Sequence, residues 1–305
     1  MGENLEEYTS YAVLDLHNMN QPVKRGVWPW KMNSRENLTD PEQQELHQLL
    51  SKSKNLPPQL EDIWEIMDMI WDELGCDNMQ PDQNRLDTFY RHPVWLLNDL
   101  FISEHGISLQ HRHAIRDWIF AHEDEIKLVV DYGGGFGKLA CLINDKISDV
   151  RLEIYEPYPG RYAKATIAKR RNIRFVSALS RDYDCLLAVD VLEHVADPLS
   201  ALASMIESVR NGGYLIIANC FFPVIKCHLP GTFHLRYTFD LFAAEMGLKP
   251  LGPCTGSHAF IYKKHQKVDF NWRKIRIMEK LSRFVFPFLD SVASVYRMLK
   301  NIIRK

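Results

Sequence analysis

The sequence predicts an α/β fold built on a doubly wound, mostly parallel sheet. Two observations support this prediction. Short apolar runs rich in β-branched residues alternate with helical segments between residues 126 and 220. The first run, residues 126–130, leads into a glycine-rich turn and then into an apolar-periodic segment. This order of strand, turn and helix is typical of the first half of a βαβ unit, with a nucleotide site at the carboxyl end of the strand.

The first 124 residues precede this alternation. Residues 1–58 are polar and interrupted by prolines, so we expect an irregular N-terminal arm. Residues 59–124 are predicted to form a helical cap. Its first helix follows a Pro-Pro pair and carries a single apolar stripe, and its second begins near Ser108, a favourable N-cap residue.

Residues 125–266 carry the alternation and form the predicted central domain. We expect strands at residues 126–130, 152–155, 173–176, 186–189 and 214–220. Helices are expected at residues 139–145, 161–171, 198–209 and 238–246. Strands and helices in this order predict a sheet with helices on both faces.

The turn after the first strand has the spacing Asp131-x-Gly133-x-Gly135-x-Gly137. A dinucleotide-binding turn needs Gly-x-Gly-x-x-Gly, and Lys138 occupies the position of the third glycine when the count begins at Gly133. A carboxylate just before the glycines would repel a pyrophosphate but would attract an ammonium or a sulfonium group. S-adenosylmethionine carries both cations and no phosphate, so the turn favours this cofactor.

The stretch at residues 126–140 and four ordered segments after it resemble the class I S-adenosylmethionine-dependent methyltransferases: residues 151–157, 173–178, 183–198 and 211–218. The resemblance implies a seven-stranded sheet of the class I methyltransferase type, closed by an antiparallel hairpin of two further short runs at residues 249–254 and 258–263. It also implies a cofactor site made of Asp131, Gly133, Gly135, Gly137, Glu156, Pro157 and Asp190. Glu156 would accept hydrogen bonds from both ribose hydroxyls, because two carboxylate oxygens match two adjacent donors.

Two contacts of the cofactor are left unassigned. Many family members carry an acid just after the third strand that meets the adenine amino group, but residues 177–180 contain no acid here. Arg91 and Arg112 precede the first strand, in the segment that often covers the cofactor in this family. Either could hold the methionine carboxylate through paired hydrogen bonds or could be an ordinary surface arginine.

The first candidate cluster for acceptor chemistry is Asp190, Glu193 and His194, after the fourth strand. Asp190 would lie within reach of the cofactor's ammonium group. The pattern Asp-x-x-Glu-His resembles the metal-binding Glu-x-x-Glu-His of methyltransferases that modify RNA 3′ ends, whereas Leu-Glu-His-Val is common among sequences that resemble the ubiquinone-pathway O-methyltransferases. We expect Glu193 and His194 to cap or pack, with His194 a further catalytic candidate, and we expect no metal.

The second candidate cluster lies in residues 226–238, an insertion over the acceptor side of the cleft in this fold. His234 matches by position the His-Leu-Arg-Tyr-like segments of the family. A neutral imidazole titrates near working pH and could deprotonate a sugar hydroxyl. We therefore expect His234 to be the base or a substrate contact, with His228 as the second choice. A helix cap is the alternative for His234.

Composition and charge exclude some classes of function. The chain has 37 basic and 39 acidic residues, so it lacks the basic excess that nucleic-acid binding favours. Its six cysteines are scattered without a Cys-x-x-Cys pair, which indicates reduced thiols in a cytoplasmic protein. We expect no signal peptide, because the N-terminus is acidic and lacks an apolar core. No apolar stretch is long enough to span a bilayer.

Residues 267–305 are predicted to form a basic amphipathic helical tail. From residue 269 onward, nine basic residues stand against three acidic ones, a net charge of +6. A heptad-like seam runs through the tail: Met278, Leu281, Val285, Phe288, Val292, Val295, Leu299 and Ile302. This pattern favours a helix lying on an anionic membrane surface. Self-association into a homo-oligomer and packing on the central domain are the alternatives.

The acceptor is inferred from the tail and from the aromatic and histidine residues. A membrane-associated tail indicates an acceptor kept at the inner face of the membrane, and Trp28, Trp30 and the histidines suit a hydroxylated ring. The sequence therefore predicts O-methylation of a sugar or surface-polysaccharide intermediate, with S-adenosylhomocysteine as the second product. A quinone-like or other small phenolic acceptor is one alternative. A non-catalytic scaffold that keeps the cofactor fold is another.

Overall fold

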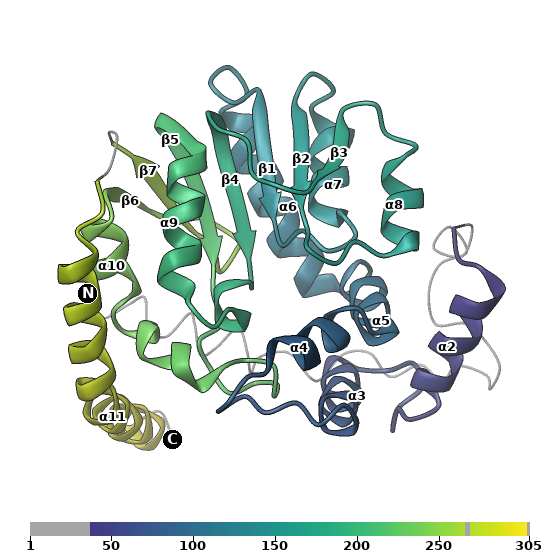
Figure 1. Ribbon diagram of the computed structural model, residues 1–305, viewed down its shortest axis with the longest axis horizontal. Coiled ribbons are helices and arrows are strands. Elements are labelled where there is room, and N and C mark those ends of the chain that lie inside the picture. The colour runs from purple at the N-terminus through teal and green to yellow at the C-terminus, as the bar shows by residue number, and fades with distance from the viewer. Residues whose placement is uncertain (1–36, 266–268, 304–305) are drawn as a thin grey trace.

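A seven-stranded sheet with the order β3-β2-β1-β4-β5-β7-β6 forms the centre of the computed structural model, which describes residues 37–265 and 269–303 (Figure 1). Strands β1 to β5 are parallel, and β7 is antiparallel to both β5 and β6. The strands are β1 (Leu128–Tyr132), β2 (Arg151–Tyr155), β3 (Ile173–Val176), β4 (Tyr183–Val189), β5 (Val209–Ala218), β6 (Leu248–Pro253) and β7 (Phe260–Lys264). The predicted doubly wound sheet with a closing hairpin is confirmed.

Helices cover both faces of this sheet. One face packs against α6 (Gly106–Ala121), α7 (Lys138–Lys146) and α8 (Arg161–Ile167). The other face packs against α9 (Pro198–Ser208) and α10 (Phe239–Glu245). Two short 3₁₀ helices, η2 (Leu192–His194) and η3 (Pro230–Arg236), follow strands β4 and β5. The strands are apolar on both faces because both faces are buried, as is usual for parallel sheets.

The helical cap contains more helices than the sequence predicts. Four helices, α2 (Asp40–Leu50), α3 (Leu60–Glu73), α4 (Gln83–Tyr90) and α5 (Pro93–Ile102), share one apolar core. They lie beyond the end of the sheet at which the parallel strands stop (Figure 1). The expected irregular arm is wrong for residues 40–50, since Thr39 and Glu42 form a reciprocal capping box that starts α2. Trp28 and Trp30 lie outside the described residues.

The chain order places a crevice at the centre of the sheet. Strand β1 continues to β2 and β3 on one side, whereas β4 and β5 lie on its other side. The crossover between β1 and β4 is therefore the topological switch point, at which the loops after neighbouring strands diverge. Ligands of open α/β sheets bind there, outside the carboxyl ends of the strands. The cap helices α3 to α5 lie over this position, beyond the ends of the strands (Figure 1).

The tail forms a long helix, α11 (Trp272–Ile303), whose first part packs on the domain through residues such as Ile275. Pro287 lies inside it. Within residues 37–265 and 269–303, no helix combines the length and the apolar character that crossing a membrane requires.

Candidate active site

A cavity of about 1930 Å³ lies at the switch point, between the carboxyl ends of the strands and the cap. Ligand pockets for one small molecule commonly measure roughly 300–1,000 Å³, so this volume is sufficient for a cofactor and an acceptor together. Of the predicted cofactor residues, six line the cavity: Asp131, Gly133, Gly135, Glu156, Pro157 and Asp190. Gly137 is not among the lining residues. It starts α7 instead.

The glycine turn is shaped by positions that only glycine fits well. Gly133 has a φ of +69°, and a Cβ there would lie 2.7 Å from Val191 Cγ2. Gly137 has a φ of +86°, and a Cβ there would lie 2.7 Å from Ile154 Cδ1. Left-handed backbone is strained for other residues. The turn therefore brings bare backbone to the cavity and lets α7 pack closely on β2.

Three carboxylates surround this turn. Asp131 is buried at the end of β1, and its Oδ2 has no hydrogen-bond partner among the described residues. Glu156 Oε2 accepts a hydrogen bond from the Gly135 backbone N–H at 3.1 Å. Asp99 comes from α5, and its Oδ2 accepts from the Phe136 N–H at 3.2 Å.

Burial controls the protonation of these three groups. It raises the pKa of Asp131 to about 7, and the nearby Glu156 charge adds to the rise. Burial and Glu156 likewise raise the pKa of Asp99 to about 7. The pKa of Glu156 is raised as well, mainly by burial. A cationic ligand would stabilise the ionised forms, so an unpartnered acid oxygen beside a bare glycine turn fits S-adenosylmethionine.

A fourth acid, Asp190, stands at the end of β4. Its Oδ1 lies 3.0 Å from Nε2 of His258, a residue of the loop before β7. Burial alone would raise the pKa of Asp190, but His258, Arg112 and His228 hold it below its ordinary value. Burial lowers and Asp190 raises the pKa of His258, with a net rise. The carboxyl still has 43% of its side-chain surface accessible, because it faces the cavity.

Both unassigned arginines line the cavity. Arg112 donates to the Ser108 carbonyl at 3.1 Å and is close enough to lower the pKa values of Asp99, Asp131 and Asp190. Arg91 lies over the Tyr158 ring, 4.8 Å from its centroid. Arg112 is thus the cation nearest the acids of the cofactor end, and it is the better placed of the two for a methionine carboxylate.

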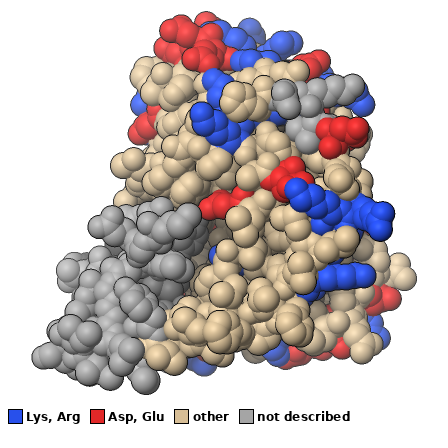
Figure 2. All heavy atoms as spheres, turned by 90° about the vertical axis from the view of Figure 1, so that its left-hand side faces the viewer, with Lys and Arg blue, Asp and Glu red and all other residues tan. Residues whose placement is uncertain are grey.

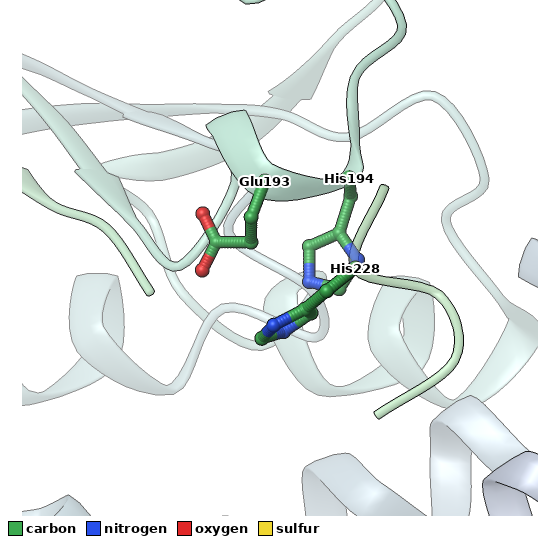
Figure 3. A group of neighbouring side chains, drawn as sticks. All are labelled: Glu193, His194 and His228. Atoms are coloured by element: carbon green, nitrogen blue, oxygen red, sulfur yellow. The ribbon is translucent and has the colours of Figure 1, made fainter. Parts of the chain in front are cut away.

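Glu193, His194 and His228 meet on the acceptor side of the cavity (Figure 3). The His194 Nδ1 lies 3.2 Å from the Cys227 carbonyl oxygen, and the His228 Nδ1 lies 2.7 Å from the Phe222 carbonyl oxygen. A carbonyl can only accept, so both Nδ1 atoms carry the proton and both Nε2 atoms are free bases. Burial lowers both pKa values, that of His194 to about 3.

The carboxyl of Glu193 is fully buried in this trio. Its Oε1 accepts from the Cys220 N–H at 2.9 Å, and its Oε2 has no described partner. Burial and the charge of Asp190 raise its pKa well above the ordinary value. The three ligand atoms lie within 4.8 Å of one another and could hold a divalent cation. Without a cation the raised pKa favours the neutral form of this carboxyl, whereas a bound cation would stabilise the ionised form.

Aromatic residues of the cap complete the acceptor side. The Tyr90 and Trp95 rings lie 6.3 Å and 5.9 Å from the His194 ring, and Tyr90 stacks on Tyr158 at 5.7 Å. Besides Asp131 Oδ2, four buried polar atoms of cavity-lining residues have no hydrogen-bond partner in the described chain: Tyr90 Oη, Trp95 Nε1, Glu193 Oε2 and Asn219 Oδ1. Buried polar groups are normally paired, so this cluster suits a ligand with several donors and acceptors.

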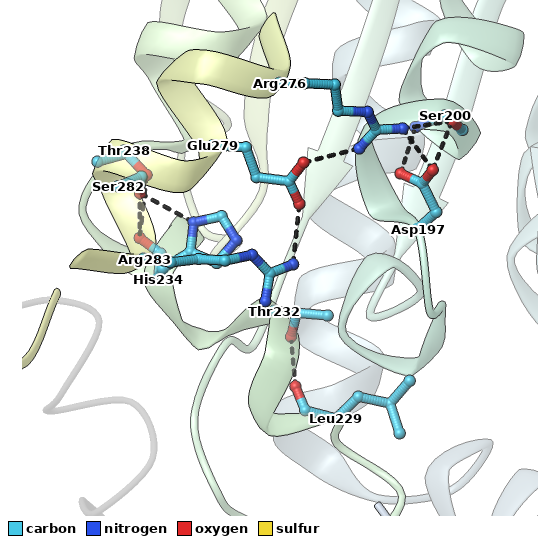
Figure 4. A network of polar contacts seen from close by, with 10 residues as sticks. All are labelled: Asp197, Ser200, Leu229, Thr232, His234, Thr238, Arg276, Glu279, Ser282 and Arg283. Carbon is cyan, nitrogen blue, oxygen red and sulfur yellow. Dashed lines mark hydrogen bonds and ion pairs between the residues drawn. The ribbon is translucent and has the colours of Figure 1, made fainter. Parts of the chain in front are cut away.

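His234, the expected base, lies elsewhere. It is 3% exposed, is absent from the cavity lining and points at α11, where its Nδ1 contacts Ser282 Oγ at 2.8 Å (Figure 4). Thr238 Oγ1 contacts the same hydroxyl at 2.7 Å. The tail helix covers η3, so this imidazole is enclosed in the contact between them. His234 therefore does not reach the acceptor side, and His228 and His194 do.

Two residues of the site, Asp99 and His258, were not predicted from the sequence. Asp99 carried a local signal, since it follows Trp95 by four residues and shares its helix face. His258 carried none, because its partner Asp190 is 68 positions away in the chain.

Known proteins were compared with the chain and its fold. Residues 100–222 match a family model described as a methyltransferase domain. No match to a curated protein was found.

Solved structures similar to the model include three methyltransferases. The mitomycin 7-O-methyltransferase MmcR is 15% identical, with 78% of this chain and 76% of that chain covered and a TM-score of 0.46. The CurJ carbon methyltransferase is 11% identical, with 74% of this chain and 68% of that chain covered and a TM-score of 0.47. The Burkholderia thailandensis 1,6-didemethyltoxoflavin-N1-methyltransferase, solved with S-adenosylhomocysteine, is 15% identical. The match covers 52% of this chain and 79% of that chain, with a TM-score of 0.39. They are named for transfer to oxygen, carbon and nitrogen, respectively.

The matched residues include strands β1, β2, β3, β4 and β5, the glycine turn and the acids Asp131, Glu156 and Asp190. Residues 100–222 therefore match a methyltransferase domain, and they lie in the seven-stranded sheet that the resemblance to the class I, S-adenosylmethionine-dependent methyltransferases implies.

Proposed function

We propose that the chain is an O-methyltransferase whose acceptor is a hydroxylated ring, such as a sugar or a surface-polysaccharide intermediate. The observation that supports this acceptor is the set of unpartnered polar atoms on Tyr90, Trp95, Glu193 and Asn219, placed among aromatic faces. A sugar offers an apolar ring face and several hydroxyl groups, so it would satisfy the polar atoms and stack on the rings.

His228 is the proposed base. His228 lines the cavity, and because its Nδ1–H donates to the Phe222 carbonyl at 2.7 Å, Nε2 is its basic nitrogen. This contact fixes the tautomer and stabilises the imidazolium that forms, much as the third group of a catalytic triad does. His194, whose ring centroid lies 4.8 Å away, is the second candidate.

S-adenosylmethionine, when bound, supplies an electrophilic methyl group on its sulfonium. The chain's own residues hold the two reactants in line and remove the acceptor proton. In that transfer, His228 Nε2 would accept the proton of the acceptor hydroxyl. The lowered pKa of His228 keeps it unprotonated at neutral pH, ready for this step.

A small phenolic acceptor is the second candidate. The Tyr90–Tyr158 stack and Trp95 form an aromatic wall that suits a flat ring. A phenol loses its proton near pH 10, so it requires less help from a base than a sugar hydroxyl does. The four unpartnered polar atoms favour the sugar, because a phenol would leave most of them unsatisfied.

The test is a screen for S-adenosylhomocysteine release with free sugars, lipid-linked sugars and phenols as acceptors. Calorimetry with S-adenosylmethionine precedes it, because a cofactor that fails to bind would indicate the scaffold alternative. We expect turnover with a sugar class and little with phenols. Turnover with phenols alone would replace the acceptor proposal and leave the methyltransferase assignment intact.

A further inference from the structure

Helix α11 has a buried face and an exposed apolar face. Ile275, Glu279 and Ser282 are buried against the domain. On the opposite side, successive steps of three or four residues form an exposed apolar stripe: Ile277, Leu281, Phe284, Phe288, Val292 and Val295. Phe284 is 83% exposed and Phe288 is 71% exposed. At about 1.5 Å per residue, the stripe extends for about 27 Å along the helix.

The predicted seam and the observed packing therefore differ. Of the seam residues, Met278 packs against the domain, whereas Leu281, Phe288, Val292 and Val295 are exposed. The contact with the domain combines the apolar packing of Ile275 and Met278 with polar pairs. Arg276 bridges Asp197 and Glu279, and Glu279 also pairs with Arg283 (Figure 4). Packing on the domain uses one face of α11 and leaves the apolar stripe uncovered by the described residues.

The charges of α11 are arranged asymmetrically around the stripe. Its described acids are turned inward: Glu279 is buried between two arginines, and Asp290 pairs with Arg236. Arg273 and Lys280 are exposed and make no ion pair with any described residue. Figure 2 shows this side of the molecule, where Lys and Arg side chains, and also Asp and Glu side chains, lie beside an uncharged area. The exposed face is therefore apolar with a basic border.

We propose that α11 docks the chain on an anionic lipid surface. An amphipathic helix with an apolar face and basic flanks lies in the plane of a bilayer, with that face buried about 5–10 Å deep. Two phenylalanines would enter the acyl boundary while Arg273 and Lys280 meet acidic headgroups. A second copy of α11 is the less suitable occupant, because pairing two stripes would bring unpaired cations of like charge together and leave them without counter-charge.

The helix is also held in a fixed position relative to the cavity. Arg236 donates to the Phe221 carbonyl at 2.8 Å and pairs with Asp290 of α11, so the loop after β5 and the helix are connected. The later part of α11 lies at the end of the molecule that carries the cavity and the cap (Figure 1). Docking would therefore bring the acceptor side close to the membrane, whatever the acceptor is.

The experiment is co-sedimentation of the full chain with two vesicle preparations, one of phosphatidylcholine alone and one with phosphatidylglycerol added. We expect binding to the anionic vesicles that weakens as salt rises. The Phe284→Glu/Phe288→Glu variant should lose at least about tenfold in partitioning, because two large apolar side chains no longer enter the bilayer. Replacing Arg273 or Lys280 with Glu should weaken partitioning onto anionic vesicles by about fivefold for each residue.

The matched control is Leu241→Glu/Leu251→Glu, which changes two exposed apolar residues outside α11 and should bind like the unaltered chain. Binding of S-adenosylmethionine checks that each variant is folded. Equal sedimentation with neutral and anionic vesicles would overturn the proposal. So would a lipid-independent dimer, measured by light scattering, that the Phe284→Glu/Phe288→Glu change dissociates.

Discussion

Asp190 at the end of β4 and His258 in the loop before β7 form a hydrogen-bonded pair, with 3.0 Å between Oδ1 and Nε2. Asp190 has a φ of +55°, a left-handed conformation that is uncommon for residues other than glycine. The His258 N–H in turn donates to Nδ1 of His111, a buried residue of α6. Backbone and side chain are therefore both constrained, so that one carboxylate is presented to the cavity with its second oxygen available for a cation.

The first prediction is a double-mutant cycle on this pair. Asp190→Asn should weaken S-adenosylmethionine binding by about tenfold to a hundredfold, because a charge-assisted hydrogen bond is worth roughly 1.5–3 kcal/mol. His258→Gln should weaken it less, since Asp190 keeps its charge but loses its orienting partner. The double variant should bind no more weakly than Asp190→Asn alone. Calorimetry measures all three.

His265→Gln is the matched control for this cycle, because His265 is an exposed histidine that directly follows β7. Strictly additive losses for Asp190 and His258 would mean that His258 acts independently of the carboxylate.

The second prediction concerns pH. Burial raises the pKa of Asp131 to about 7, so this carboxyl becomes neutral as the pH falls through 7. A cationic ligand prefers the ionised form, and its binding must release the proton. The affinity for S-adenosylmethionine should therefore be constant above neutral pH and fall below it, by up to about tenfold per pH unit for each such acid.

Burial also raises the pKa of Asp99 to about 7, so pH alone does not distinguish the contributions of Asp99 and Asp131. Substituting each acid in turn does. Asp131→Asn should bind more weakly at pH 8 and should lose part of the pH dependence, with the remainder removed by Asp99→Asn. Asp117→Asn, an exposed change on α6, should leave the profile unaltered. Affinity that stays flat between pH 8 and pH 6 in the unaltered chain would show that neither acid meets the cation.

The cofactor end of the site could be predicted because its determinants are local. Asp131 and the glycines lie within seven consecutive residues, and Glu156 ends the next strand. Parallel strands stop at one edge of the sheet, so acids at their carboxyl ends meet without further information. The sheet itself was predictable for the same reason, since β1, β4 and β5 each contain a short apolar run and helices separate most of the parallel strands.

The acceptor side could not be predicted in the same way. His228 and His234 are six residues apart in one insertion, yet one faces the cavity and the other faces Ser282. Their orientations depend on a 3₁₀ helix and on α11, which packs from almost fifty residues further along the chain. The family position favoured His234, but the tail helix covers it. The helices α4 and α5, which cover the cavity, could not be predicted because they are too short to show a clear apolar period.

The third prediction identifies the base. His228→Asn should lower kcat by about 10²–10⁴-fold, because general base catalysis typically contributes this much. Binding of S-adenosylmethionine should be unchanged, since the imidazole lies on the acceptor side. His194→Asn should have a smaller effect, through the packing of the two rings. Single-turnover rates with a saturating acceptor separate the chemical step from binding.

His234→Gln serves as the contrast. It should keep kcat but lower the free energy of unfolding by about 1–3 kcal/mol, because it disturbs a buried hydrogen bond with Ser282. Chemical denaturation measures this loss. Loss of kcat in His234→Gln with full activity in His228→Asn would restore the assignment that the sequence favoured.

The fourth prediction decides between a free base and a bound cation at the trio of Glu193, His194 and His228. The raised pKa of Glu193 favours a neutral carboxyl, and a neutral amide has the same shape, so Glu193→Gln should keep most of the turnover. Treatment with EDTA followed by gel filtration should likewise leave the rate unchanged. If chelation abolishes turnover and Mn²⁺ or Zn²⁺ restores it, and if Glu193→Gln cannot be restored, the trio holds a metal ion. His228 would then be a ligand, and the acceptor hydroxyl would lose its proton through the metal's charge instead.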